Sequence, residues 1–395
     1  MRNIAVQGGK MAEIKTDGLP KLIAFYLPQF HEIPENNQWW GKGFTEWTNI
    51  RKAKPLFEGH HQPRIPLGGR YYDLLDNDVK KWQAELAKKY GVFGFCYYHY
   101  WFKNGKQLLE KPAEQMLADS AIDQPFCFCW ANENWSKNWD GGNYEVIMEQ
   151  DYGNEKDWEM HFNYLLPFFR DPRYITYEGK PLFIIYKPEQ IIDLKEMVAY
   201  FRRRAVEEGF PGLCAAFQFP VYYNDIYYDE TIFDFRIGFE PTYSRNPKRE
   251  VRNHSGKVEL LKKMKADRLI RDYRRLKQKK QKGRGASAQR LSMFFYDDAW
   301  EAILNNTWKK DFWPGAFVDW DNTPRNRYGV VYSGYSPEKF GKYMSRLIAK
   351  AKNENKPCIF INAWNEWCEG AYLEPDEKDG YGKLEAIRDA LKENE

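Results

Sequence analysis

Two glutamates near the C-terminal end of the chain have the type and spacing needed for acid–base chemistry. Glu366 and Glu369 are three positions apart and follow a short apolar run, 359–361. At this spacing two carboxyl groups come close together, and their repulsion separates their pKa values into one acid and one base. Asn365 precedes Glu366 and Trp367 follows it, and an amide and a flat ring beside two acids are typical of a sugar-cleaving site. The alternative is a pair of acids that decorates a loop.

Aromatic and polar side chains also follow other apolar runs. Asn and Glu can hydrogen-bond sugar hydroxyls, and Trp and Tyr rings can stack on a pyranose, whereas the alternative for each residue is ordinary packing or capping. We predict Glu366 and Glu369 as catalytic residues. We predict substrate contacts at Tyr26, Glu46, Trp47, Tyr98, His99, Trp130, Asn132, Glu133, Tyr186, Trp320, Asp321, Asn365 and Trp367.

Two further groups of residues could bind a metal ion. His31, His60 and His61 occur near several glutamates, but their spacing matches no ligand pattern. Asp319 and Asp321 form a D-x-D, a pair that holds a divalent cation against a nucleotide sugar in some transferases. The tripeptide is common, and no glycine-rich nucleotide motif follows a strand. We therefore predict no metal site and no cofactor, and we interpret Asp321 as a substrate contact.

The order of apolar and amphipathic segments predicts the fold. Continuous apolar runs that alternate with helical patterns indicate a parallel sheet covered by helices, and eight such units favour a (β/α)8 TIM barrel over an open sheet. Helices are expected at 76–90, 154–169, 191–208 and 336–353. The eight predicted strands are 22–27, 94–101, 125–130, 181–186, 212–218, 233–240, 315–320 and 358–364.

The predicted organisation is an N-terminal extension, 1–20, followed by one domain, 21–392. Long insertions are expected after strand 1, at 29–73, and after strand 6, at about 244–313. Because active sites of such barrels lie at the carboxyl ends of the strands, the predicted site residues would gather at one rim.

The second insertion is strongly basic. The chain carries a net charge of +4, yet residues 245–290 alone contain 18 Lys and Arg against four acids. Residues 258–282 have the pattern of a basic helix with a thin apolar stripe. Such a stretch could contact a membrane surface or an acidic partner, or it could be a solvated helix. It has few interleaved aromatic residues, so we expect no nucleic-acid partner.

Cysteine usage and the N-terminal residues bear on the compartment. The six cysteines mostly lie in apolar runs and form no C-x-x-C, which favours buried reduced thiols over disulfides. Residues 1–17 contain no apolar signal-peptide core, and no run reaches the length of a membrane span. These features predict a cytoplasmic location.

Seven motifs of this chain resemble the WbsX-type proteins, a group similar to glycoside hydrolase family 99, the endo-α-mannosidases and endo-α-mannanases. The resemblance extends from about residue 21 to 392. Its motifs are 25–31 (FYLPQFH), 41–49 (GKGFTEWTN), 63–64 (PR), 94–101 (GFCYYHYW), 130–135 (WANENW), 320–325 (WDNTPR) and 365–375, which contains NEWCEG and LEP.

The resemblance implies a barrel enzyme that needs no metal and acts on α-linked, manno-configured glycans with retention. In family 99 the first Glu of Asn-Glu-x-x-Glu-Gly acts on the 2-hydroxyl of the sugar, whose oxygen attacks C1 and forms a 1,2-anhydro intermediate. The second Glu protonates the leaving oxygen and later serves as base for water. These roles fall on Glu366 and Glu369, respectively.

Two alternatives stay open. WbsX-type proteins are often named as glycosyltransferases of bacterial surface polysaccharide synthesis, so this chain could be a transferase or transglycosylase of O-antigen or capsule assembly. It could also be a non-catalytic glycan-binding barrel. A binding protein would not need both glutamates, whereas a metal-dependent transferase would need Asp319 and Asp321.

Overall fold

Parallel strands form a nearly closed barrel, as the sequence predicts. The computed structural model describes residues 11–15, 18–136, 146–219, 230–244, 291–326 and 328–395. The strands pair in the order β13-β11-β10-β9-β5-β3-β2-β16-β14. The seventh strand is interrupted at Pro314. Its two parts, β13 and β14, pair with β11 and β16, respectively, and stand at the two ends of this order. The bounds are β2 (Lys21–Tyr26), β3 (Gly94–Trp101), β5 (Phe126–Trp130), β9 (Lys180–Ile185), β10 (Cys214–Phe219), β11 (Phe235–Gly238), β13 (Phe312–Trp313), β14 (Gly315–Phe317) and β16 (Cys358–Asn362).

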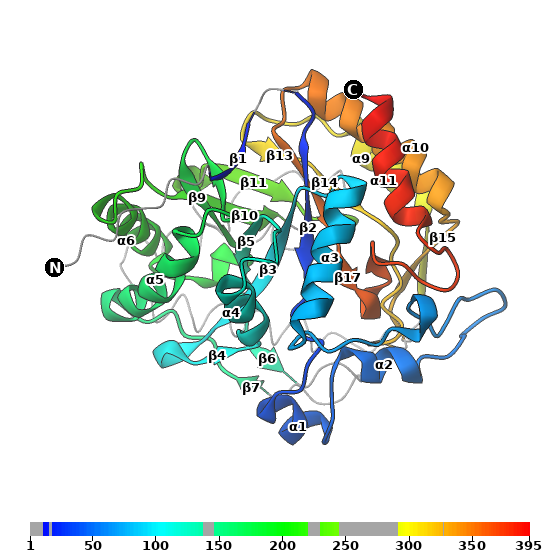
Figure 1. Cartoon of the computed structure of the whole chain (residues 1–395), viewed down its shortest axis with the longest axis horizontal. Coiled ribbons are helices and arrows are strands. Elements are labelled where there is room, and N and C mark those ends of the chain that lie inside the picture. The colour runs from blue at the N-terminus through cyan, green and yellow to red at the C-terminus, as the bar shows by residue number, and fades with distance from the viewer. Residues whose placement is uncertain (1–10, 16–17, 137–145, 220–229, 245–290, 327) are drawn as a thin grey trace, which may run out of the picture.

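Helices cover the outside of the barrel (Figure 1). The four predicted helices are present as α3 (Asn77–Tyr90), α5 (Glu155–Phe169), α6 (Leu194–Glu207) and α10 (Pro337–Asn353). The ends of α3 follow from its sequence, because Asp76 accepts a hydrogen bond from the Asp78 N–H and Gly91 adopts the left-handed conformation at the C-cap. The other outer helices are α4 (Lys111–Ala118), α9 (Tyr296–Asn305) and α11 (Gly382–Glu393).

Side chains alternate between the two faces of each strand, and this alternation decides which residues can reach the site. On β3, Tyr98 faces the barrel interior and stacks with Phe25 at 5.7 Å between ring centroids. His99, the next residue, faces outward and packs against Phe128 and against Tyr164 of α5. Aromatic residues therefore fill both the barrel interior and the layer beneath the helices.

The first predicted insertion carries α1 (Pro34–Trp40), α2 (Glu46–Lys52) and the 3-10 turn η1 (Leu67–Gly69). The second differs from the prediction at its end, because α9 and β13 are parts of the barrel itself. Between residues 291 and 333, β12 (Ser292–Phe295) also pairs with β15 (Val330–Ser333). The basic residues 245–290, including the predicted helix 258–282, lie outside the described residues.

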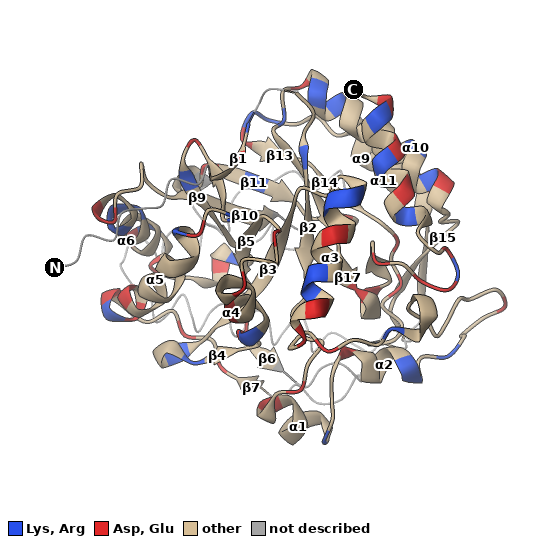
Figure 2. Cartoon of the chain, viewed as in Figure 1, with Lys and Arg blue, Asp and Glu red and all other residues tan. Residues whose placement is uncertain are grey.

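The N-terminal segment also joins the fold where the structure describes it. Within the predicted extension, β1 (Ala12–Ile14) pairs with β8 (Ile175–Tyr177), which forms a hairpin with β9. All six cysteines are buried and free, as predicted. Charged residues of both signs lie along α3, α10 and α11 (Figure 2). Among the described residues, no helix is long and apolar enough to span a bilayer.

Candidate active site

The segment after the eighth strand carries the predicted catalytic pair. From β16 the chain enters β17 (Asn365–Glu366), the 3-10 turn η6 (Trp367–Glu369) and β18 (Ala371–Tyr372), which pairs back onto β17. Asn365 fixes this turn to the first strand, because its side chain accepts from the Leu27 N–H at 2.7 Å and donates to the Leu27 carbonyl at 3.0 Å. Both glutamates therefore extend from a pinned turn at the carboxyl end of the barrel.

Arg325 brings three carboxylates together at this rim. Its Nη1 lies 2.8 Å from Glu369 Oε1, and its Nη2 lies 3.2 Å from Glu366 Oε2. The same Nη2 is 3.1 Å from Oε1 of Glu46, which is the first residue of α2 and is fully buried. One guanidinium thus holds the predicted catalytic pair and a third acid from the first insertion within a single cluster.

Burial raises the pKa of both predicted catalytic carboxyls. Burial raises the pKa of Glu366 to about 8. The Arg325 charge lowers this pKa by less than burial raises it, and repulsion from Glu369 raises it further. Burial likewise raises the pKa of Glu369, against the attraction of Arg325. Two carboxyls that interact this closely titrate as a unit, so the pair retains a proton at neutral pH. The cluster can therefore supply both an acid and a base.

Gly370 lets the backbone of the catalytic turn pack tightly. It adopts φ +65, and a Cβ at this position would lie 2.9 Å from Cζ of Arg64 and 3.0 Å from the Asp321 nitrogen. The Asp321 N–H also donates to the Glu369 carbonyl at 2.7 Å. A side chain at 370 would therefore displace the residues that fix the backbone of Glu369.

Glu374 ties the catalytic turn to the barrel wall. This buried carboxylate accepts hydrogen bonds from the indoles of Trp364 (3.1 Å) and Trp367 (2.6 Å). It also accepts from Gln83 of α3 at 2.7 Å and from the Tyr72 hydroxyl at 2.8 Å. Burial raises its pKa to about 7, although these four donors lower it. Glu374 thus fixes two tryptophans of the segment that carries the catalytic pair.

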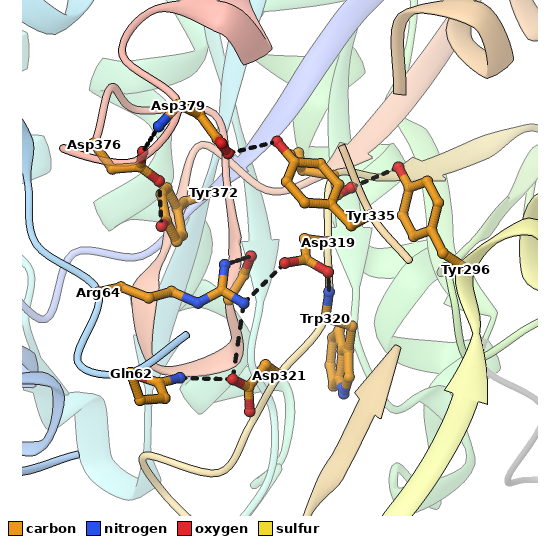
Figure 3. A network of polar contacts seen from close by, with 12 residues as sticks. Gln62, Arg64, Tyr296, Asp319, Trp320, Asp321, Tyr335, Tyr372, Asp376 and Asp379 are labelled. Atoms are coloured by element: carbon orange, nitrogen blue, oxygen red, sulfur yellow. Dashed lines mark hydrogen bonds and ion pairs between the residues drawn. The ribbon is translucent and has the colours of Figure 1, made fainter. Parts of the chain in front are cut away.

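The D-x-D carboxylates bond to protein side chains. Asp319 forms an ion pair with Arg64 at 2.8 Å, as Figure 3 shows. Asp321 accepts from Gln62 at 2.6 Å and from His60 Nε2 at 2.9 Å. The Leu56 N–H donates to His60 Nδ1, which places the proton of a neutral ring on Nε2. In the part of the chain that the structure describes, no cluster of His, Cys, Asp and Glu could hold a metal ion.

These contacts hold Asp321 in its charged form. Burial acts to raise the pKa of Asp321, but the hydrogen bond from His60, the Arg64 charge and the Thr323 and Gln62 hydrogen bonds together bring it well below its ordinary value. A carboxylate with its lone pairs engaged in this way is suited to hold the rim together. Its predicted contact with substrate stays a prediction.

Some predicted substrate contacts lie near the Arg325 cluster. Tyr98 faces the interior, and burial, with Glu366 among the nearby charges, raises the pKa of its phenol. Tyr186 lies against it at 6.5 Å between ring centroids. Glu133 follows β5 and forms an ion pair with Lys187. Trp320 follows the seventh strand and is partly exposed. Glu46 is fully buried within the cluster. Direct contact with a ligand stays a prediction for each of these residues.

Other predicted contacts are engaged by the protein itself. Tyr26 faces outward and donates to Gln83 of α3 at 2.7 Å. His99 and Trp130 also face outward, toward α5, where His99 bonds to His161 and Trp130 donates to the Trp101 carbonyl. The Asn132 side chain donates to the Lys187 carbonyl and accepts from the Lys187 N–H. These side chains position the rim, and direct contact with a sugar stays a prediction for each.

The remaining two predicted contacts, Trp47 and Trp367, pack together beneath the rim. Their ring centroids are 5.4 Å apart, and the Trp47 indole donates to the Tyr72 carbonyl at 2.7 Å. Trp367 also stacks on Tyr372 at 3.8 Å. Both indoles are buried, so their main visible role is to support the turn that carries the glutamates.

Sequence reasoning gave no role to Arg325. Its signal was present, because Arg325 closes the 320–325 motif after the seventh strand and the predicted site contained many acids without a cation. Which arginine would neutralise them depends on how the loop after β14 folds back over η6, and no local pattern encodes that path.

The barrel, with a carboxylate pair at its carboxyl rim, has a glycoside-hydrolase-like fold. Residues 22–387 match the family described as "Glycosyltransferase WbsX", and the chain belongs to that family. Two proteins named "Uncharacterized protein WxcX", from two strains of Xanthomonas campestris pv. campestris, are each 36% identical to it. The alignments cover 95% and 94% of this chain but 51% and 49% of the relatives. The chain thus spans about half the length of these relatives.

Solved structures share the fold at low sequence identity. The GH99 endo-alpha-mannosidase from Bacteroides thetaiotaomicron superposes with a TM-score of 0.51 at 14% identity, over 94% of this chain and 96% of that one. A structure described as "Glycoside hydrolase-like protein" superposes with a TM-score of 0.52 at 12% identity, over 97% of each chain. Fold and family together imply carbohydrate processing.

Proposed function

We propose that the protein cleaves α-linked, manno-configured glycans with retention, through a 1,2-anhydro sugar intermediate, in bacterial surface polysaccharide metabolism. The observation that supports this most is the Glu366–Glu369 pair held by the two ends of the Arg325 guanidinium. Two carboxyls on the same side of a substrate suit a reaction in which the sugar supplies its own nucleophile. A pair of opposed carboxylates would instead flank the scissile bond.

The proposed reaction has two steps. Ionised Glu366 takes the proton of the 2-hydroxyl as its oxygen bonds to C1, while Glu369 gives a proton to the leaving oxygen as the C1–O bond breaks. Water then attacks C1 and loses a proton to Glu369 as the bond between C1 and the 2-oxygen breaks, and the released 2-oxygen regains its proton from Glu366. Because the pair shares its proton, the one retained in the free protein is available to Glu369.

Arg325 would keep both steps near neutral pH. Its charge opposes the effect of burial on both carboxyls, so that one of the pair can ionise when substrate is bound. Glu46, at 3.1 Å from the same guanidinium, limits how far that charge favours ionisation of the pair. The three acids thus share one cation.

Digestion of α- and β-linked oligosaccharides by wild type, Glu366→Gln and Glu369→Gln tests the proposal. We expect cleavage of α-manno linkages by wild type and a loss of about 10²–10⁴-fold in both variants. An α-mannoside with a 2-O-methyl group lacks the nucleophile and should not react. Wild-type turnover in both variants, or cleavage of the 2-O-methyl substrate, would refute the mechanism.

Glycosyl transfer is the second candidate, favoured by the description of the matching family as a glycosyltransferase. In the proposed mechanism a sugar hydroxyl could open the 1,2-anhydro intermediate in place of water. Mass spectrometry of reactions with added acceptor sugars separates the two outcomes. Longer products that still require Glu366 and Glu369 would identify a transglycosylase, whereas products that require Asp319 and a divalent cation would identify a different transferase.

A further inference from the structure

A cavity lies on the outer side of the barrel, at the start of α5. Its volume is about 350 Å³. We call it the α5 pocket. None of Glu46, Arg325, Glu366 and Glu369 lines it. Aromatic rings and polar side chains both line it, and the residues used in the argument are Trp101, Trp130, Tyr152, Trp158, Lys103 and Asp151.

Strand alternation separates this pocket from the candidate active site. Trp101 at the end of β3 faces outward and stacks on His161 of α5, with 4.6 Å between centroids and 6° between planes. Tyr100, one residue earlier, has the opposite orientation. Burial raises the pKa of its phenol, and among the charges that act on it Glu366 has the largest effect. The sheet therefore lies between the pocket and the catalytic pair.

The loop that forms one wall is held in place by its own contacts. Gly153 adopts φ +57, and a Cβ there would lie 2.2 Å from Asp157 Oδ2. Asp157 in turn accepts from the Asn154 N–H at 3.0 Å, within the capping box of α5. The Tyr152 hydroxyl donates to the Asn132 carbonyl at 2.8 Å. The wall is thus built before any ligand arrives.

The pocket offers both ring surfaces and polar groups. The Trp130 indole donates to the Trp101 carbonyl at 3.0 Å, and the Trp158 indole to the Tyr152 carbonyl at 2.8 Å, so the aromatic rings present carbon surfaces to the cavity. At the mouth, Lys103 pairs with Asp151 at 2.9 Å. A sugar combines apolar C–H faces with hydroxyls that both donate and accept, and it matches this arrangement.

The charged side chains that line the pocket do not favour an anionic ligand. They are one cation, Lys103, and two acids, Asp151 and Asp157, of which Asp151 pairs with Lys103. Burial lowers the pKa of His161, which also lines the pocket, well below the ordinary value, and lowers that of His99, its hydrogen-bond partner at 2.9 Å, to about 3, so both rings are neutral. The volume lies near the lower end of the roughly 300–1,000 Å³ of small-ligand pockets, which suits one or two sugar rings.

We propose that the α5 pocket is a second binding site for neutral sugar units of a long glycan. The proposal rests on the proposed function for the nature of the ligand. Tyr152 also links the two sites, because it bonds to the turn that carries Asn132 and Glu133 on the other side. A glycan leaving the candidate active site across this turn would reach the pocket.

The test measures binding of short and long neutral α-manno-oligosaccharides to the full chain by calorimetry, in a Glu369→Gln background that prevents turnover. Trp158→Ala should weaken binding of the long ligand roughly tenfold, as expected for loss of one aromatic contact, and leave the short ligand unaffected. The double variant Lys103→Ala, Asp151→Ala changes the mouth of the pocket without touching the core of the protein. It should also weaken binding of the long ligand. The control is Lys88→Ala, which removes an exposed ion pair with Asp123 elsewhere on the surface.

Equal affinity of the long ligand for all these proteins would overturn the proposal, as would absence of any binding of neutral oligosaccharides. The proposed function is tested separately by turnover of the short substrate in proteins with an intact Glu369. If Trp158→Ala weakens long-ligand binding while Glu366→Gln leaves short-substrate turnover unchanged, the pocket stands and the mechanism fails. If Trp158→Ala leaves long-ligand binding unchanged while Glu366→Gln abolishes short-substrate turnover, the mechanism stands and the proposed binding site is wrong.

Discussion

Two arginine–carboxylate clusters lie side by side at the rim of this barrel, and they differ in how well their charges are balanced. Arg325 faces three glutamates, and burial raises the pKa of two of them. Arg64 faces two aspartates, and hydrogen bonds from His60, Gln62 and Thr323 complete the shell of Asp321, whose pKa is well below its ordinary value. The first cluster can exchange protons near neutral pH, whereas the second is fixed in one charge state.

The comparison shows that a motif does not determine the chemistry of its carboxylates. A D-x-D and an E-x-x-E are both short acidic pairs at strand ends, and either could be assigned a catalytic task from sequence. The number of donors and cations around each carboxylate separates them. Four substitutions test this difference, beginning with the largest expected effect.

Removal of Arg64 should have the greatest cost. Arg64→Met leaves Asp319 and Asp321 buried without their cation, and we expect a loss of about 3–5 kcal/mol in the free energy of unfolding. Urea denaturation at neutral pH measures it. A loss under 1 kcal/mol would show that the aspartates do not depend on this arginine.

Gly370→Ala should follow. The added Cβ would meet Arg64 and the Asp321 backbone, and the residue would keep a left-handed conformation that L side chains disfavour. We expect a loss of about 2–4 kcal/mol from overpacking and strain together, with reduced turnover because Glu369 moves. As a control, Gly68→Ala combines a similar φ of +65 with open space around the Cβ, so it should show the strain alone.

Arg325→Met should cost less than Arg64→Met, and its cost should depend on pH. The folded-state pKa values of Glu366 and Glu369 are already raised, and loss of the cation raises them further. A raised pKa gives stability that is present at low pH and lost as pH rises through the folded value. We therefore expect about 1–3 kcal/mol of destabilisation above pH 8 and less at pH 5.5.

The same variant should move the pH–activity profile. In wild type the alkaline limb of kcat/KM should lie near the pKa of Glu366, about 8, and Arg325→Met should shift it to higher pH. An alkaline limb at the same pH in both proteins would show that this pair does not control the reaction. If Arg325→Met destabilised the protein equally at both pH values, the contrast with the Arg64 cluster would be lost.

Glu374→Gln should have the smallest effect of the four. The amide cannot accept from all the donors around Glu374, so we expect a loss of about 1–2 kcal/mol. The pKa of Glu374 is raised to about 7 by burial, so wild type gains stability from its protonation below pH 7 and loses it as pH rises through that value. The variant should flatten this part of the stability curve, as thermal unfolding between pH 5 and 8 would show.

Much of the barrel could be predicted because its strands are continuous apolar runs between turn signals. The eight predicted strands match the observed ones to within a few residues at most ends, although β13 was placed in the insertion. That strand is only two residues long, and Pro314, which cannot donate to a sheet, separates it from β14. A split strand leaves no continuous run to detect.

The candidate site could be predicted only in part. The spacing of Glu366 and Glu369 and the motif around Glu46 predict these three acids, which the structure brings together on Arg325. The position of His99 and Trp130 at strand ends predicts substrate contacts. Because Tyr98 faces inward, the period of two turns His99 toward the helices, and Trp130, which pairs with His99 on β5, faces the same way. Arg325 depends on contacts between loops far apart in sequence, so its role emerges only from the three-dimensional structure.

Turnover of a short α-manno-oligosaccharide by Glu369→Gln, measured beside its unfolding midpoint, tests the central claim most directly. Glu369 is partly exposed, with 22% of its side chain accessible, so the amide should fold as wild type does. We expect an unchanged midpoint and a loss of at least about a hundredfold in kcat. Wild-type kcat in a correctly folded Glu369→Gln protein would contradict it.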